Sequence, residues 1–438
     1  MSVQQNTLRQ DNLAMTPGTI APDTLPVLRT LERKLLWLSS WMIHNANHLR
    51  DHADGLKVGG HQASSASCAS IMTALYFHAL RPEDRVAVKP HASPVFHAIQ
   101  YLLGNQTLQK LKDFRGFGGA QSYPSRTKDT DDVDFSTGSV GLGVAMTGFA
   151  SLVQDFVRAK GMMREWPEGR MVAVVGDAEL DEGNIYECLL ECWKHRLKNC
   201  WWVIDYNRQS LDAVVSDRLF TKVAGLFETM GWQVITLKYG HALEALFAEP
   251  GGDRLREWID ACPNSLYSAL AFQGGEAWRR QLGADLADAP DTLALVEGHD
   301  DDALARLMTN LGGHDLAALT GAFDAAPSDK PVCFIAYTIK GYGLPFQGHK
   351  DNHAGLMTAA QMSEFREANG IADGEEWERF SGLEHDAETL QRFLDAIPFA
   401  SRGTRRLSSA HLEVPAIEPQ PTTKPTSTQD GFGRILAE

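Results

Sequence analysis

Apolar residues recur at every third or fourth position near the start of the chain, a spacing typical of one face of an amphipathic helix. The recurring positions are Leu28, Leu31, Leu35, Leu38 and Met42. We therefore predict a helix over residues 25–50 that packs on a larger body. Residues 1–24 are polar and lack this spacing, and we expect them to be disordered.

Short runs rich in β-branched and apolar residues follow, each with a turn and usually a helical stretch behind it. The runs are Arg85–Val88, Met171–Val175, Cys200–Ile204, Trp232–Leu237 and Val332–Ile339. Repeated strand–helix units indicate an α/β fold with a doubly wound, mainly parallel sheet. The strand pattern is interrupted over residues 249–331, and we predict that these residues form an insertion before the last strand. The whole of residues 25–398 is then one domain.

The composition turns to Ser, Thr, Pro and Arg beyond Pro398. Such a composition is typical of an extended linker, so we predict one over residues 399–438. A linker should lead to a second domain, and no such domain follows in this sequence.

The charge balance excludes several classes of protein. With a net charge of −15 and no run of Lys or Arg, the chain lacks the basic surface of a nucleic-acid binder. It has no apolar stretch of about eighteen residues and no basic-then-apolar leader, so we expect a cytoplasmic protein with no membrane span. Six cysteines without a Cys-x-x-Cys pair are interpreted as reduced core thiols.

Polar residues follow two of the predicted strands. Gly176-Asp177-Ala178-Glu179 comes after one strand, and Asp205-Tyr206-Asn207-Arg208-Gln209 comes after the next. The carboxyl ends of neighbouring parallel strands lie side by side, so these segments should face one another. The Asp177 carboxylate, the Asn207 amide oxygen and an oxygen of Gln209 form half of an octahedral Mg²⁺ shell, which a diphosphate and water would complete.

Small residues near these strand ends allow a phosphate to approach the backbone. Gly176 and Ala178 flank the aspartate, and a glycine-rich turn over residues 136–143 leads into an apolar helical stretch. Helix N-termini beside such turns add N–H donors and a positive dipole. Taken alone, a Gly-Asp pair is more often an ordinary strand-end turn.

The spacing of the two segments resembles that of thiamine diphosphate enzymes of the transketolase and homodimeric pyruvate dehydrogenase type. Their signature is Gly-Asp-Gly followed by Asn about thirty positions later, and here Asp177 precedes Asn207 by 30 positions. Ala178 departs from the signature's second Gly. Five further segments are similar, in order, to the pyruvate dehydrogenase first component: residues 59–64, 90–94, 122–124, 312–315 and 338–343. Glu182-Gly183 and Asp205-Tyr206-Asn207 look more like the transketolase N-terminal subunit.

The resemblance implies site residues. It implies catalytic roles for His61, His91, Tyr123, His353 and Glu182. It implies cofactor contacts at Ser64, Ser139, Val140, Gly141, Gly176, Ala178, Glu179, Asp205 and Asn207, and metal ligands at Asp177, Asn207 and Gln209.

Other interpretations of these residues stay open. Loop context favours His353 over His349. Glu182 either joins a carboxylate relay across a dimer or favours a helix N-terminus. His314 belongs to a family-like segment, but a helix-capping turn explains it equally well. For any histidine taken alone, a hydrogen-bonded imidazole is the more common explanation.

The resemblance implies thiamine diphosphate and Mg²⁺ as cofactors and a second domain that binds the aminopyrimidine. We therefore expect one subunit of a split enzyme, inactive alone, with a separate partner chain in an α2β2-type assembly. The first hypothesis is oxidative decarboxylation of pyruvate or a related 2-oxo acid, with a lipoyl acyltransferase as acceptor. The alternatives are a transketolase-like transfer between sugar phosphates, in which Arg126 and Lys128 would hold the phosphate, and a non-catalytic cofactor-binding subunit.

Overall fold

The computed structural model describes residues 24–51, 58–162, 165–210, 213–214, 219–400, 411–413 and 424–437. The chain divides into two compact units, residues 1–403 and 404–438. In the second unit the described structure is mainly one helix, α18 (Thr428–Ala437). Disorder was expected over residues 1–24, of which 1–23 lie outside the described residues and Thr24 begins a helix. Most of the expected linker also lies outside the described residues.

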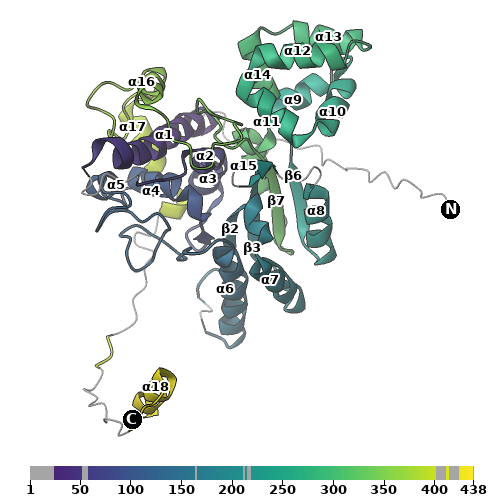
Figure 1. Cartoon of the computed structure of the whole chain (residues 1–438). Helices are drawn as coiled ribbons and strands as arrows, with labels where there is room; N and C mark the ends of the chain where they lie inside the picture. Colours follow the sequence, from purple (N-terminus) through teal and green to yellow (C-terminus); the bar gives the residue numbers. More distant parts are fainter. Residues whose placement is uncertain are drawn as a thin grey trace, which may run out of the picture. The chain divides into compact units, whose positions relative to one another are not determined.

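A five-stranded parallel sheet forms the centre of the first unit (Figure 1). Its order is β1-β2-β3-β7-β6. The strands are β1 (Arg85–Ala87), β2 (Met171–Gly176), β3 (Cys200–Tyr206), β6 (Gln233–Leu237) and β7 (Val332–Tyr337), and a short hairpin pairs β4 (Gln209–Ser210) with β5 (Ala213–Val214). The predicted α/β class, the parallel sheet and the five predicted strands are confirmed.

Both faces of the sheet are covered, because alternate residues of each strand enter different cores. Val172 and Val174 pack into one core, whereas Ala173 and Val175 pack into the other. The first core includes α1 (Thr24–His44), α3 (Ala69–Ala74), α4 (Ser93–Leu102) and α15 (Leu316–Asp324). The second includes α6 (Leu142–Ala159), α7 (Gly183–Lys194) and α8 (Leu219–Thr229). Strands buried on both faces explain the nearly continuous apolar runs in the sequence.

The first predicted helix is shorter than expected in its regular part. It is α1, which ends at His44 and continues as a π-helical turn, Asn45–Leu49, before Arg50 becomes extended. The Asn47 side chain donates to the carbonyls of Ile43 and Gly59 at 2.8 and 3.0 Å. This bridge fixes the glycine pair that precedes His61.

The residues between β6 and β7 are helical. Besides α15, the helices there are α9 (His241–Phe247), α10 (Gly252–Ala261), α11 (Asn264–Gln273), α12 (Gly275–Asp285), α13 (Pro290–Glu297) and α14 (Asp301–Met308). They gather beside the carboxyl ends of β6 and β7 (Figure 1). Trp278 is fully buried among them, with the Tyr267 ring 5.1 Å away. We call α9–α14 the helical insertion.

The remaining helical elements of the first unit are short. They are α2 (Gln62–Ser67), α5 (Leu108–Lys112), α16 (Ala359–Ala368) and α17 (Ala387–Asp395), together with the single turns Leu75–Ala79, Pro90–Ala92, Asp177–Asp181, Gly312–His314 and Pro398–Ala400. Within the described part of the chain, no helix combines the length and the apolar character that a bilayer crossing requires. The six cysteines are free thiols, and five of them are buried.

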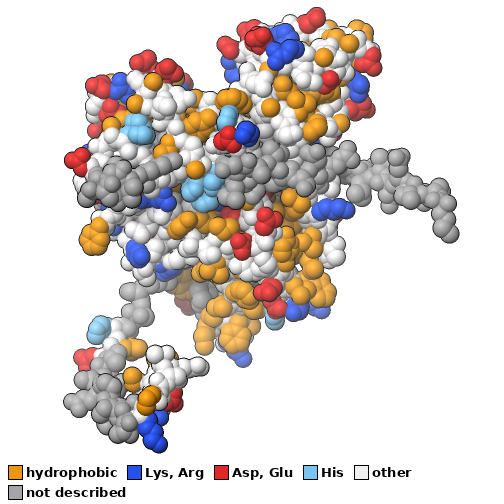
Figure 2. Space-filling model, viewed as in Figure 1, with side chains coloured by type: hydrophobic (Ala, Val, Ile, Leu, Met, Phe, Trp, Pro, Cys, Tyr) orange, Lys and Arg blue, Asp and Glu red, His pale blue; other side chains and the backbone are white. Residues whose placement is uncertain are grey.

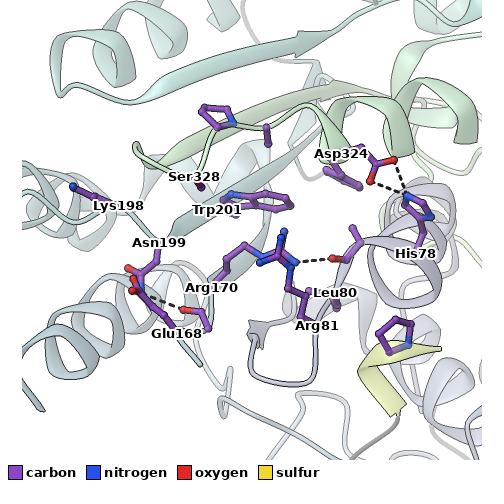
Figure 3. A pocket seen from close by; sticks show the side chains of 16 residues that line it. His78, Leu80, Arg81, Glu168, Arg170, Lys198, Asn199, Trp201, Asp324 and Ser328 are labelled. Atoms are coloured by element: carbon purple, nitrogen blue, oxygen red, sulfur yellow. Dashed lines mark hydrogen bonds and ion pairs between the residues drawn. The ribbon is translucent and has the colours of Figure 1, made fainter. Parts of the chain in front are cut away.

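A cavity of about 540 Å³ lies at the amino ends of the strands (Figure 3). Arg170, just before β2, stacks over the Trp201 ring at 4.0 Å and donates to Asp84 and to the Ala79 carbonyl. This arginine ties β2 to the segment before β1. No residue of the predicted site lines this cavity. The predicted metal ligands instead follow the carboxyl ends of β2 and β3, at the other end of the sheet.

Candidate active site at the carboxyl ends of β2 and β3

The three predicted metal ligands follow β2 and β3 where these strands end side by side. Gly176 pairs with Asp205 in the sheet, so the next residues of both strands leave it together. Asp177 Oδ2 accepts from the backbone N–H of Arg208 at 2.6 Å, and Asn207 Oδ1 accepts from that of Gln209 at 3.1 Å. Asp177, Asn207 and Gln209 are all buried. The structure thus brings these three residues together, as the sequence predicted.

Asp205 lies at the centre of a buried network and is itself fully buried. Its donors are Ser67 Oγ at 2.7 Å, Cys68 Sγ at 3.2 Å, Lys89 Nζ at 2.7 Å, Asn207 Nδ2 at 3.2 Å and Thr338 Oγ1. Burial alone would raise the pKa of Asp205, but the Lys89 ammonium and the hydrogen bonds outweigh it and hold the pKa at about 2. Asp205 therefore stays ionised and orients the Asn207 amide. A direct cofactor contact by Asp205 stays a prediction.

Glu179 joins the two glycine-rich turns. Its carboxylate accepts from the N–H groups of Gly176 and Gly141, both at 2.9 Å. Gly141 has φ of 77° and precedes α6, and a Cβ there would lie 2.8 Å from Glu182 Cβ. This position needs glycine for its conformation and for space. Ser139 is exposed and Val140 half-buried beside this turn, and their cofactor contacts stay predictions.

Ala178 fits its turn without a left-handed backbone. Among the described non-glycine residues, only Arg115, Arg196 and Arg208 have positive φ. The Ala178 N–H donates to Asp177 Oδ1 at 2.9 Å. The methyl group that replaces the signature's second glycine therefore causes no backbone strain at this position.

Three predicted histidines lie together, close enough to Lys89 for its charge to act on His61 and His91. The ring centroids of His61 and His91 are 4.0 Å apart, and the His353 ring lies 4.9 and 5.5 Å from them. Burial, followed by the charge of His353, lowers the pKa of His61 to about 4, and burial with His61 lowers that of His91 to about 2. Neutral imidazoles at pH 7 can both accept and donate a proton. The chemistry that this cluster offers is proton transfer.

His349 lies apart from this cluster. Its ring contacts Phe272 of the helical insertion, with centroids 4.6 Å apart. Lys340 Nζ, by contrast, lies 3.3 Å from His353 Nδ1. Between the two loop histidines, the structure therefore groups His353 with the other imidazoles.

The other predicted residues lie around this cluster. Tyr123 is 38% exposed and close to Arg115, whose guanidinium donates to the Val58 carbonyl at 3.0 Å. Ser64 is buried in α2. Glu182 directly precedes α7 without capping it through its side chain. Roles for these three residues stay predictions.

Comparison with known proteins shows what this part of the chain resembles. A model of the transketolase thiamine diphosphate binding domain matches residues 59–249. This range contains the predicted metal ligands, both glycine-rich turns, His61 and His91. Residues 59–249 are therefore similar to the thiamine diphosphate binding domain of transketolases.

Curated relatives of this chain carry the name pyruvate dehydrogenase E1 component. The protein from Mycobacterium tuberculosis is 29% identical over 373 residues, which cover 80% of this chain and 38% of the relative. The protein from Escherichia coli K12 is 27% identical over 336 residues, covering 74% and 37%. The chain thus spans less than two fifths of the length of these relatives.

Solved structures with the same fold are transketolases. The Campylobacter jejuni enzyme aligns with a TM-score of 0.57 and 20% identity, covering 86% of this chain and 46% of the enzyme. A variant from Pichia stipitis aligns with a TM-score of 0.58 and 16% identity, covering 86% and 44%. At this identity the likeness concerns the fold.

The residues after β2 and β3 offer oxygen ligands to a divalent cation. Gln209 Oε1 is buried and accepts no hydrogen bond from the described residues. Asp177 forms no ion pair within the described chain, and burial together with the Asp205 charge raises its pKa to about 7. A buried carboxylate and an unpartnered amide oxygen suit a hard cation. The residues therefore fit the Mg²⁺ that the fold implies.

Sequence reasoning missed two lysines of this site. Lys89 directly follows an apolar strand, and a lysine placed there signals a buried ion pair. Lys340 belongs to a segment that was recognised only as a family match.

His314 accepts from the Ile339 N–H at 2.8 Å and stacks on Tyr342 at 3.6 Å. The helix cap beside it is Asp315, which accepts from the first turn of α15.

Proposed function

We propose that this chain supplies the diphosphate- and metal-binding half of a thiamine diphosphate enzyme that decarboxylates pyruvate or a related 2-oxo acid. The observation that carries the proposal is the buried set Asp177, Asn207 and Gln209, with one unpartnered oxygen, together with three clustered histidines near Lys89, the partner of Asp205. The names of the curated relatives favour a 2-oxo acid over a sugar phosphate. Acyl transfer to a lipoyl group of a partner is part of this proposal.

Some residues of the site would bind the metal and the cofactor, and others would transfer protons. Asp177, Asn207 and Gln209 would hold Mg²⁺, through which a diphosphate would bind. When bound, the cofactor supplies the carbanion and the electron sink. His61 and His91, neutral at pH 7, would exchange protons with the substrate oxygen. The Lys340 ammonium beside His353 would stabilise negative charge on a substrate carboxylate or carbonyl.

We propose further that a partner chain covers α6 and α7, whose outer faces are apolar. The exposed side chains are Leu142, Phe149, Val153 and Phe156 on α6 and Tyr186, Leu190 and Trp193 on α7. Hydrophobic side chains gather over these helices in the lower part of Figure 2. Contiguous exposed apolar surface marks an interaction site. α6 begins at the Gly141 turn and α7 at Glu182, so a chain seated there would lie next to the site.

The proposal is tested by assaying the full chain alone and with a separate chain that carries a pyrimidine-binding domain. Both samples receive thiamine diphosphate and Mg²⁺, and the assays measure 2-oxo acid-dependent reduction of an electron acceptor and ketol transfer between sugar phosphates. We expect only the mixture to be active, and only in the first assay. Activity of the isolated chain would overturn the split arrangement.

The other outcomes separate the alternatives. Ketol transfer by the mixture would favour the transketolase-like function, for which Arg126 would have to give up its contact with the Asp134 carbonyl at 3.0 Å. Cofactor binding without activity in either assay would favour a non-catalytic subunit. Phe156→Asp should abolish activation by the partner, whereas Phe117→Asp, at a fully exposed phenylalanine outside α6 and α7, should not.

A further inference from the structure

Arg208 has an unusual backbone conformation at the centre of the proposed metal site. It stands between Asn207 and Gln209, and its φ of 66° lies in the left-handed region. This backbone conformation is strained for an L-residue, whereas glycine adopts it without strain. Some contact must therefore hold Arg208 in place.

The Arg208 side chain is buried and held by aromatic rings. Its guanidinium carbon lies 4.5 Å from the ring centroid of Tyr267 and 5.8 Å from that of Tyr337. Nη2 approaches the Thr338 carbonyl at 3.5 Å, and the residue is only 7% exposed. Arg208 forms no salt bridge with any described residue, so ring contacts are its main restraint.

Tyr267 belongs to the helical insertion and is itself firmly placed. It lies on α11, is 2% exposed, donates its hydroxyl to the Met308 carbonyl and packs on Trp278. The next turns of α11 contact the loop that carries the histidines. A Cβ on Gly348 would lie 2.6 Å from the Ser268 carbonyl oxygen, and Phe272 contacts His349. The insertion thus reaches the loop of the metal ligands through Tyr267 and the histidine loop through Phe272.

We propose that Arg208 is a positioning residue through which the helical insertion shapes the metal site. Tyr267 holds the Arg208 side chain, and this contact keeps the Arg208 backbone left-handed. The Arg208 N–H then donates to Asp177 Oδ2 at 2.6 Å, and the N–H of the next residue, Gln209, donates to Asn207 Oδ1 at 3.1 Å. The inference rests on the proposed metal site and adds the element that preorganises it.

The test measures Mg²⁺ affinity of the full chain by calorimetry in a fixed excess of thiamine diphosphate, after subtraction of the same titration without protein. The variants are Arg208→Ala, Arg208→Gly and Tyr267→Leu. Arg196→Ala is the matched control, because Arg196 also has a left-handed backbone, with φ of 54°, but is exposed at the end of α7. Thermal unfolding of every variant reports the change in stability separately.

We expect Arg208→Ala and Tyr267→Leu to weaken Mg²⁺ binding roughly tenfold, because residue 208 stays strained and loses its restraint. Arg208→Gly should remain within about threefold of the wild type, since glycine adopts the conformation at little cost. Arg196→Ala should leave the affinity unchanged. This rescue by glycine separates control of the backbone from a general loss of packing.

Two results would overturn the inference while the wild type binds Mg²⁺. One is an unchanged affinity in Arg208→Ala, and the other is an Arg208→Gly variant as weak as Arg208→Ala. If Arg208→Ala does not fold, Tyr267→Leu decides alone, and an unchanged affinity there refutes the role of Tyr267. A wild type that binds no Mg²⁺ in the presence of thiamine diphosphate overturns the proposed metal site itself.

Discussion

Removing the ammonium of Lys89 tests the buried network under the site. Lys89 is 6% exposed and pairs with the fully buried Asp205 at 2.7 Å. Lys89→Met leaves the Asp205 charge in place without its cation, and breaking a buried pair from one side costs about 3–5 kcal/mol. The shift of the Asp205 pKa from 3.8 to about 2 corresponds to about 2–3 kcal/mol, spread over all its donors. We therefore expect a loss of about 3 kcal/mol in the free energy of unfolding.

Urea denaturation at pH 7, followed by tryptophan fluorescence and by circular dichroism, measures this loss. The double variant Lys89→Met/Asp205→Asn removes both charges and should recover more than half of it, because no unpaired charge remains buried. A loss below about 1 kcal/mol in Lys89→Met would show that the hydroxyl and thiol donors suffice without the cation. A double variant no better than the single one would refute the charge argument.

Two further predictions concern binding and turnover. Burial and the Asp205 charge raise the pKa of Asp177 to about 7, so protons compete with Mg²⁺ for this carboxylate below pH 7. Calorimetry should therefore show that the Mg²⁺ affinity falls as the pH falls, by a factor approaching about ten per pH unit. Asp177→Asn should bind Mg²⁺ weakly and with a flat pH profile, and a steep profile in that variant would assign the proton to another group. Loss of a proton-transfer residue costs about 10²–10⁴ in rate, so His353→Ala should lower kcat in the complete enzyme by this factor, while His349→Ala should change it less than fivefold. Equal losses in the two histidine variants would contradict the grouping of His353 with His61 and His91.

Much of the fold could be predicted because the strands of a parallel sheet buried on both faces appear in the sequence as nearly continuous apolar runs. The runs at Met171–Val175 and Val332–Ile339 are apolar throughout, so their positions were found to within two residues. The meeting of Asp177 and Asn207 at two strand ends could also be predicted, since topology alone brings the ends of β2 and β3 together. These are consequences of chain direction and register, which neighbouring residues encode.

Contacts between distant segments could not be predicted in the same way. The five donors to Asp205 come from four separate segments, and no local pattern joins Ser67 or Thr338 to a strand end. The same holds for Arg208 and Tyr267, which are far apart in sequence and meet only because the helical insertion folds back on β7. The choice between His349 and His353 depended likewise on how one loop packs against α11. Such contacts depend on tertiary packing rather than on periodicity.

The central claim is that residues after β2 and β3 bind the diphosphate of thiamine diphosphate through a divalent metal. The most direct measurement is calorimetric titration of the full chain with thiamine diphosphate, in Mg²⁺ and again in EDTA, beside Asp177→Ala. We expect saturable binding in Mg²⁺, displacement by inorganic diphosphate, and no binding in EDTA or by Asp177→Ala. Binding of equal affinity in EDTA, or an unchanged affinity in Asp177→Ala, would contradict the claim.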